Sequence, residues 1–117
     1  MMISKNFARF EFACHCNCGA DTIDAGLIKV LQEIRDNFNK PVTVTSGVRC
    51  MHHNERVGGT PKSQHLNGRA ADIIVSGVDP EDVVKWVNTI YPNSLGLGDY
   101  STFTHIDSRN KQARWVG

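Results

Sequence analysis

Apolar residues recur at helical spacing in two segments of the chain, with charged residues between them. The first segment carries Ile23, Leu27, Ile28, Val30, Leu31, Ile34 and Phe38, and the second carries Val83, Val84, Trp86, Val87, Ile90 and Tyr91. This spacing predicts two helices, each packed on one face. Thr22 or Asp21 is expected to cap the first helix. Asp79 and Pro80 are typical of the start of the second.

Short runs with β-branched or mainly apolar residues alternate with these helices and predict strands. The predicted strands are residues 42–46, 70–75, 95–100, 103–107 and 113–116. Residues 51–62 contain glycine and proline and predict a loop with one helical turn around residues 53–57. Because helices and strands follow no regular βαβ order, we expect an α+β fold with a small, mainly antiparallel sheet packed against two main helices.

The length of 117 residues fits one modest hydrophobic core, so a single domain over residues 1–117 is expected. The formal net charge of +1, with scattered Lys and Arg, argues against a nucleic-acid partner. No apolar run is long enough for stable membrane insertion, and Lys5 and Arg9 fall where a signal peptide needs apolar residues. We therefore expect a protein that is made in the cytoplasm and, if it acts outside, is released by other means. A monomer is also expected.

Four cysteines occur in the chain, at positions 14, 16, 18 and 50. The alternating spacing of Cys14, Cys16 and Cys18 differs from the Cys-x-x-Cys knuckle of most structural zinc sites. Three interpretations stay open: free or packed thiols, a disulfide from Cys50 to one of the other three, and a second metal site.

Asp72 lies within the most apolar predicted strand, where an ionised carboxylate needs a cation or another partner. His65 can fold back beside it across a turn that contains glycine, and His105 can approach from a neighbouring strand. Two imidazoles and one carboxylate are a donor set that catalytic zinc sites use. The alternative is that Asp72 pairs with Arg49 or Arg69 and that both histidines are ordinary polar residues.

The run Ser63-x-His65-x-x-Gly68-x-Ala70-x-Asp72 resembles the signature of the zinc D-Ala-D-Ala metallopeptidase family. This family includes D-alanyl-D-alanine carboxypeptidases, Van-type dipeptidases and phage L-alanyl-D-glutamate endolysins. Residues 46–49 resemble the Ser-Gly-x-Arg segment of the family. Residues 11–14, 103–109 and 113–115 resemble its short, single-domain branch. The resemblance implies a fold similar to hedgehog and the D-Ala-D-Ala peptidases, and zinc held by His65, Asp72 and His105.

The same resemblance implies that Arg49 binds the scissile carbonyl oxygen and stabilises the negative charge that develops on it. A surface arginine that binds a carboxylate is the alternative. Ser63 and Gln64 are expected to orient substrate or His65, although the pair also suits a turn.

The general base is the point at which the chain departs from the family pattern. Well-known relatives have Glu or Asp three positions before the last histidine ligand, where this chain has Thr102. We expect Asp99 to be the base. Asp107 is expected to be a functional partner of the histidine ligand, with the base and a salt bridge to Arg109 as alternatives, and residues 52–53 supply two further imidazoles as proton carriers.

The predicted substrate is the stem peptide or cross-link of bacterial peptidoglycan, cut by a zinc-dependent endopeptidase that acts after release or as part of a virion. A D-alanyl-D-alanine carboxypeptidase is the alternative within the family. A zinc-bearing module that binds the cell wall without turnover is the alternative from another class, because the acidic residue before His105 is missing.

Overall fold

A five-stranded sheet forms the centre of the computed structural model, which describes residues 1–16 and 18–117. The strands are β1 (Val42–Ser46), β2 (Ala70–Val75), β3 (Gly96–Asp99), β4 (Thr104–Asp107) and β5 (Ala113–Val116). Their order in the sheet is β1-β2-β4-β3-β5, and every neighbouring pair is antiparallel except β3 and β5. The predicted α+β fold with a mainly antiparallel sheet is confirmed.

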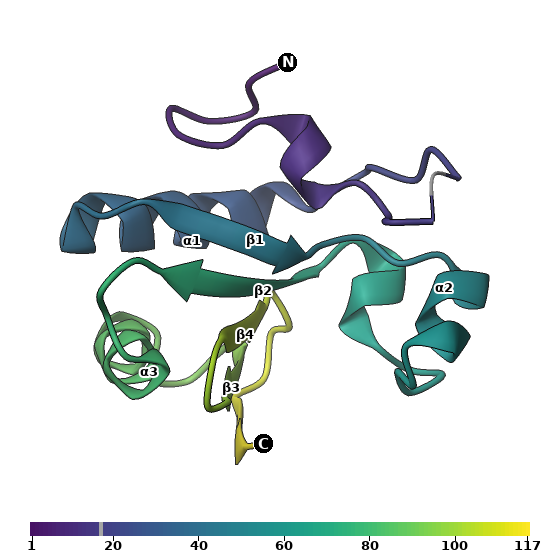
Figure 1. The fold of residues 1–117 in the computed structure, drawn as a ribbon. Coiled ribbons are helices and arrows are strands. Elements are labelled where there is room, and N and C mark those ends of the chain that lie inside the picture. Colours follow the sequence, from purple (N-terminus) through teal and green to yellow (C-terminus); the bar gives the residue numbers. More distant parts are fainter. Residues whose placement is uncertain (17) are drawn as a thin grey trace.

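Two longer helices pack against one face of this sheet. They are α1 (Ala25–Phe38) and α3 (Pro80–Ile90). A shorter helix, α2 (Met51–Arg56), lies at the other end of the molecule from α3 (Figure 1). Two 3-10 turns, η1 (Arg9–Phe12) and η2 (Gln64–Asn67), complete the helical elements of the described residues.

The hydrophobic core lies between the sheet and the two longer helices. Inward-facing side chains of β2, β3 and β4 meet the apolar stripes of α1 and α3, and Phe7 and Phe12 close the core from the N-terminal segment. The main buried contributors are Leu27, Leu31, Ile34, Ile73, Val83, Val87, Leu97 and Ile106. Since side chains alternate across a strand, the residues between these positions project from the opposite face.

Two local predictions need correction. The first helix is capped by Asp24, whose side chain accepts a hydrogen bond from the Leu27 amide at 3.1 Å, and not by Asp21 or Thr22. The Asp24 amide also donates to the Gly68 carbonyl at 2.8 Å, so this helix start is fixed by a contact to a distant part of the chain. The helical turn predicted around residues 53–57 begins two residues earlier, at Met51.

No helix in the described part of the chain combines the length and the apolar character that crossing a bilayer requires.

Candidate metal centre

The register of the sheet places two of the predicted site residues, Asp72 and His105, in one row on the face away from α1 and α3. Asp72 of β2 lies opposite His105 of β4, and His105 lies opposite Gly98 of β3, which is paired with Trp115 of β5. On the other side of Asp72, Ser46 of β1 extends the row. Paired residues in neighbouring strands share a face and lie within side-chain reach. The row therefore crosses all five strands, with Asp72 and His105 at its centre.

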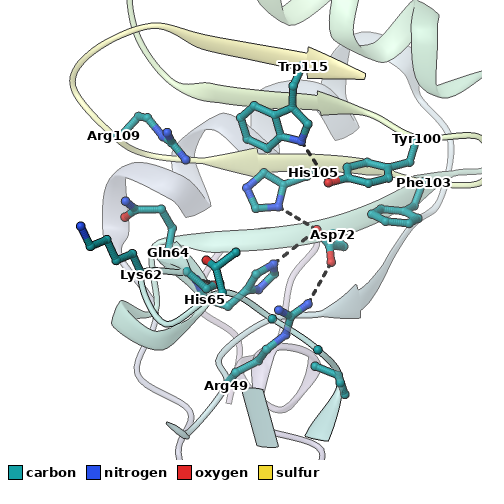
Figure 2. Close-up of a pocket in the computed structure, with 15 residues that line it drawn as sticks. Arg49, Lys62, Gln64, His65, Asp72, Tyr100, Phe103, His105, Arg109 and Trp115 are labelled. Carbon is teal, nitrogen blue, oxygen red and sulfur yellow. Dashed lines mark hydrogen bonds and ion pairs between the residues drawn. The ribbon is translucent and has the colours of Figure 1, made fainter. Parts of the chain in front are cut away.

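The side chains of His65, Asp72 and His105 meet at one point, shown at the centre of Figure 2. Asp72 Oδ1 lies 2.9 Å from His105 Nδ1 and 3.4 Å from His65 Nε2. One donor atom from each of the three residues falls within 4.8 Å of the other two. His65 arrives from η2, where the Ser63 hydroxyl accepts a hydrogen bond from its amide, and the turn closes at Gly68 with a φ of +64°.

In His65 and His105, the ring nitrogen that points away from Asp72 is hydrogen-bonded to another part of the chain. His65 Nδ1 lies 2.6 Å from the Gly47 carbonyl oxygen, which can only accept, so Nδ1 carries the proton. His105 Nε2 donates to the Asp107 carboxylate at 2.8 Å. Neutral imidazoles then turn unprotonated nitrogens toward the carboxylate of Asp72. This chemistry fits a divalent cation, because three electron-pair donors converge where a positive charge is needed.

The ionisation of the cluster follows from the same contacts. Burial by itself raises the pKa of Asp72, but the hydrogen bonds and charges of His105 and His65 outweigh it and lower the pKa to about 2. Burial lowers the pKa of His105, whereas its hydrogen bonds to Asp107 and Asp72 raise it, and the net change is upward. Without a metal ion, the two carboxylates therefore favour the protonated form of His105.

Asp107 is fully buried, and both oxygens of its carboxylate accept hydrogen bonds. Besides His105, its carboxylate accepts from Arg109 Nε at 2.6 Å and Arg109 Nη2 at 2.7 Å, and from the Gly96 amide at 3.1 Å. Burial raises the pKa of Asp107, but His105 and Arg109 lower it well below its usual range. A Cβ atom at position 96 would lie 2.3 Å from Asp107 Oδ2, so the carboxylate occupies space that only glycine leaves free. Three roles were predicted for Asp107. These contacts agree with two of them: partner of a histidine ligand and salt bridge to Arg109.

Arg49 stands at the edge of the same cluster. Its Nη2 atom lies 3.5 Å from Asp72 Oδ2, while Nε donates to the Ser46 hydroxyl and Nη1 donates to the Asn54 amide oxygen. Asn54 is itself buried and donates to the Thr60 carbonyl at 2.8 Å. Three side chains from three elements thus fix one guanidinium beside the converging donors.

A cavity of about 530 Å³ opens over this cluster. Its lining combines His65, Asp72, His105 and Arg49 with Ser63 and Gln64, and adds Val57, Gly58, Gly59, Thr60, Lys62, Tyr100, Phe103, Arg109 and Trp115. Figure 2 shows the aromatic rings on one side of the cluster and Lys62 and Gln64 on another. The rings of Tyr100 and Phe103 are stacked, and that of Trp115 lies 5.1 Å from the His105 ring.

Sequence reasoning did not predict this aromatic wall as part of the site. The pairing of Gly98 with both His105 and Trp115 explains it: a Cβ atom at position 98 would lie 2.6 Å from Trp115 Nε1 and 2.8 Å from Tyr100 Cε2. The sequence signal is the Gly-x-Gly repeat in β3, which leaves one face of a strand without side chains.

The structure does not bring Asp99 to the cavity. Asp99 is paired with Thr104, whose buried side chain reaches the Pro80 carbonyl at the start of α3, so Asp99 projects to the sheet face opposite His105. His52 and His53 on α2 also lie outside the cavity lining. Among the described lining residues, Asp72 is the only carboxylate. The position of Asp99 therefore gives no support to its predicted role as base.

A family model described as Peptidase M15 matches residues 5–107. The chain belongs to the peptidase M15 family. The match covers both histidines, the aspartate and the arginine of the candidate centre, and it ends at Asp107.

This M15 chain is similar to the Peptidoglycan L,D-endopeptidase MepK of Escherichia coli strain K12, with 29% identity over 94 residues. The proteins of the same name from Escherichia coli O157:H7 and Shigella flexneri match equally well. The aligned part is 74% of this chain and 52% of those proteins, so the chain spans about half the length of the curated relatives it matches.

Proposed function

We propose that this M15 chain is a zinc-dependent endopeptidase that hydrolyses a peptide bond in the stem peptides or cross-links of bacterial peptidoglycan. The observation that carries the proposal is the convergence of His65 Nε2, Asp72 Oδ1 and His105 Nδ1 beneath an open cavity. Membership of the peptidase M15 family and the similarity to the peptidoglycan L,D-endopeptidase MepK support the substrate class.

The three converging residues would hold the zinc ion, whose chemistry when bound is that of a Lewis acid that polarises a carbonyl and acidifies water. The protein orients the two imidazoles that would bind the ion. Gly47 and Asp107 hold the two imidazoles so that their unprotonated nitrogens face Asp72. Partners of this kind fix the ring and raise its basicity as a ligand.

Arg49 supports a substrate in which negative charge develops on a carbonyl oxygen, as it does in peptide hydrolysis. Its guanidinium is held within reach of the Asp72 carboxylate and lines the cavity, so a carbonyl oxygen bound there meets a preorganised positive charge. Such preorganised charge stabilises the oxyanion that forms during acyl transfer. Lys62 adds positive charge to the lining, which complements the carboxylates of a stem peptide, while the aromatic wall complements small aliphatic side chains.

The test is digestion of defined muropeptides. The zinc-loaded protein is incubated with monomeric stem peptides and with dimers that carry an L,D cross-link, and the products are identified by mass. We expect cleavage inside the stem or cross-link, loss of cleavage with a chelator or in His105→Ala, and recovery when zinc is returned to the wild type. His52→Ala is the matched control and should cleave like the wild type, because its imidazole lies outside the cavity. Release of D-Ala alone, with stems otherwise intact, would show a carboxypeptidase and overturn the endopeptidase proposal.

One observation favours a second candidate, a zinc-bearing module that binds the cell wall without turnover. Among the described residues, the cavity lining contains no carboxylate besides Asp72. Stoichiometric zinc and sedimentation with intact peptidoglycan, without any product from any muropeptide, would establish the module.

The proposal extends to the assembly and the place of action. We expect the enzyme to act as a monomer. Action on the wall after release from the cell, or as part of a virion, stays a prediction.

A further inference from the structure

A second group of metal-binding side chains lies outside the cavity. Cys14, Cys16, Cys18 and Cys50 come together although 32 positions separate the last two in the sequence. Their four sulfur atoms all lie within 4.8 Å of one another. The first three follow η1, and Cys50 immediately precedes α2, so the cluster joins the N-terminal segment to the part of the chain that carries Arg49. In Figure 1 the segment after η1 runs to the end of the molecule where α2 lies.

The spacing of the thiols matches a tetrahedral metal site. Cys16 Sγ lies 3.4 Å from both Cys14 Sγ and Cys50 Sγ. Four sulfurs around one zinc ion at about 2.3 Å would be separated by roughly 3.8 Å, whereas a disulfide requires about 2.0 Å. The thiols are thus gathered at the distances of a shared ion, and all four are free cysteines.

Backbone amides point at two of these sulfurs, which is a second and independent observation. The Cys50 amide donates to Cys14 Sγ at 3.4 Å, and the His53 amide donates to Cys50 Sγ at 3.4 Å. Hydrogen bonds of this kind favour a negatively charged acceptor, and metal-bound sulfur is a thiolate.

We propose that Cys14, Cys16, Cys18 and Cys50 bind a structural zinc ion. Four thiolates leave no open position for substrate, so the ion has a structural role and not a catalytic one. Soft thiolate ligands in a tetrahedral arrangement select zinc or iron among the common metals, and the proposal is for zinc. The site does not depend on the peptidase activity proposed above.

The ion would fasten the N-terminal segment to the back of the candidate active site. Between β1 and Cys50, the Val48 amide donates to the Phe12 carbonyl, the Gly47 carbonyl holds His65, and the Arg49 amide donates to the His65 carbonyl. These four residues, Gly47 to Cys50, therefore contact the N-terminal segment on one side and the catalytic cluster on the other. A metal ion at Cys50 fixes the end of this connection, next to Arg49.

Metal analysis of the full chain tests the proposal without an activity measurement. Protein purified without chelator from zinc-supplemented cells should contain two zinc ions per chain. His105→Ala and the double variant Cys16→Ser, Cys18→Ser should each lose one, and their combination should lose both. Failure of either site is thus visible separately. Cys18→His is the rescue variant and should keep both ions, because imidazole can replace one thiolate in such sites.

Cobalt substitution provides a readout on the wild-type protein itself. Wild-type and His105→Ala protein loaded with cobalt should both show the intense charge-transfer absorption of thiolate bound to tetrahedral cobalt. The double cysteine variant should not. Absence of this absorption from the wild type, zinc content unchanged by the cysteine substitutions, or a non-reduced mass that lacks the hydrogens of one or two disulfides would each overturn the proposal.

Discussion

Asp107→Asn tests whether the buried carboxylate behind His105 sets the metal affinity of the centre. The substitution keeps the size of the side chain but replaces one acceptor oxygen by an amide group that donates. Asp107 receives hydrogen bonds at 2.8 Å from His105 Nε2 and at 2.6 Å and 2.7 Å from Arg109, so an amide group at either position faces a donor. The imidazole then faces either an amide group that donates or a neutral oxygen in place of the charged carboxylate, so the contact that directs its unprotonated nitrogen toward Asp72 is lost or weakened.

The magnitude follows from these contacts. Removing the partner behind a metal-bound histidine typically costs about 10- to 100-fold in metal affinity or activity. Stability should fall as well, because Arg109 and the Gly96 amide lose an ionised acceptor in a fully buried position. Breaking a buried ion pair by removing one partner costs about 3–5 kcal/mol. Arg109 is about one third exposed and can regain water, so we expect the lower end of that range.

The assay restores zinc to chelator-treated protein at buffered free concentrations and records cleavage of a stem peptide. Asp107→Asn should need about 10- to 100-fold more free zinc for half-maximal activity. Urea denaturation of metal-free protein measures the loss of stability. Glu81→Gln on α3 is the matched control, since that side chain is 65% exposed and should change neither quantity appreciably. An unchanged zinc requirement in a folded Asp107→Asn variant would refute the reasoning.

Three further predictions concern the same face of the sheet. In metal-free protein, Asp72 has its pKa lowered from 3.8 to about 2, so it contributes about 2 kcal/mol of stability that is present above pH 4 and lost as the pH falls toward 2. His105, whose pKa is raised from 6.5, contributes stability that is present below about pH 6.5 and lost as the pH rises through its folded pKa; urea denaturation across pH checks both signs, and a flat profile would contradict them. Gly98→Ala should destabilise the protein by about 1–3 kcal/mol through overpacking and also reduce kcat/KM, whereas Gly77→Ala, at a φ of +73° with open space around it, should cost about 1 kcal/mol without reducing kcat/KM. Arg49→Lys keeps the charge but not the fixed guanidinium, so kcat should fall by about 10²- to 10³-fold with a smaller change in KM; equal kcat values would exclude the proposed role in stabilising the oxyanion.

The elements of the fold were predictable because their signals are local. Helical spacing in α1 and α3, β-branched residues in β1 and an apolar run in β2 each decide the state of their own segment. The cap of α1 was predicted wrongly, because Asp24 is positioned by its amide contact to Gly68 and not by its immediate neighbours. Local propensity contains no information about that contact.

The candidate centre was predictable in part for a similar reason. A carboxylate in an apolar strand and a specific motif point to Asp72 and His65 from the sequence alone. The contributions of Asp99 and Asp107 depend instead on strand register, since pairing decides which sheet face each carboxylate occupies. The gathering of Cys50 with the three N-terminal cysteines depends likewise on tertiary packing.

The two sides of the cavity differ in how far their sequence can change without loss of the candidate centre. One side is the row of residues that crosses the five strands. Shifting β4 by one residue would turn His105 to the helix face, so insertions near that side remove the centre altogether. The opposite side, from Val57 to Gln64, is largely a loop and is held mainly through Asn54 and Thr60. Changes in the side chains of residues 57–62 leave both the strand register of Asp72 and His105 and the contact of Ser63 to His65 unchanged, which makes this part of the loop the place where a new substrate preference can be selected without rebuilding the candidate centre.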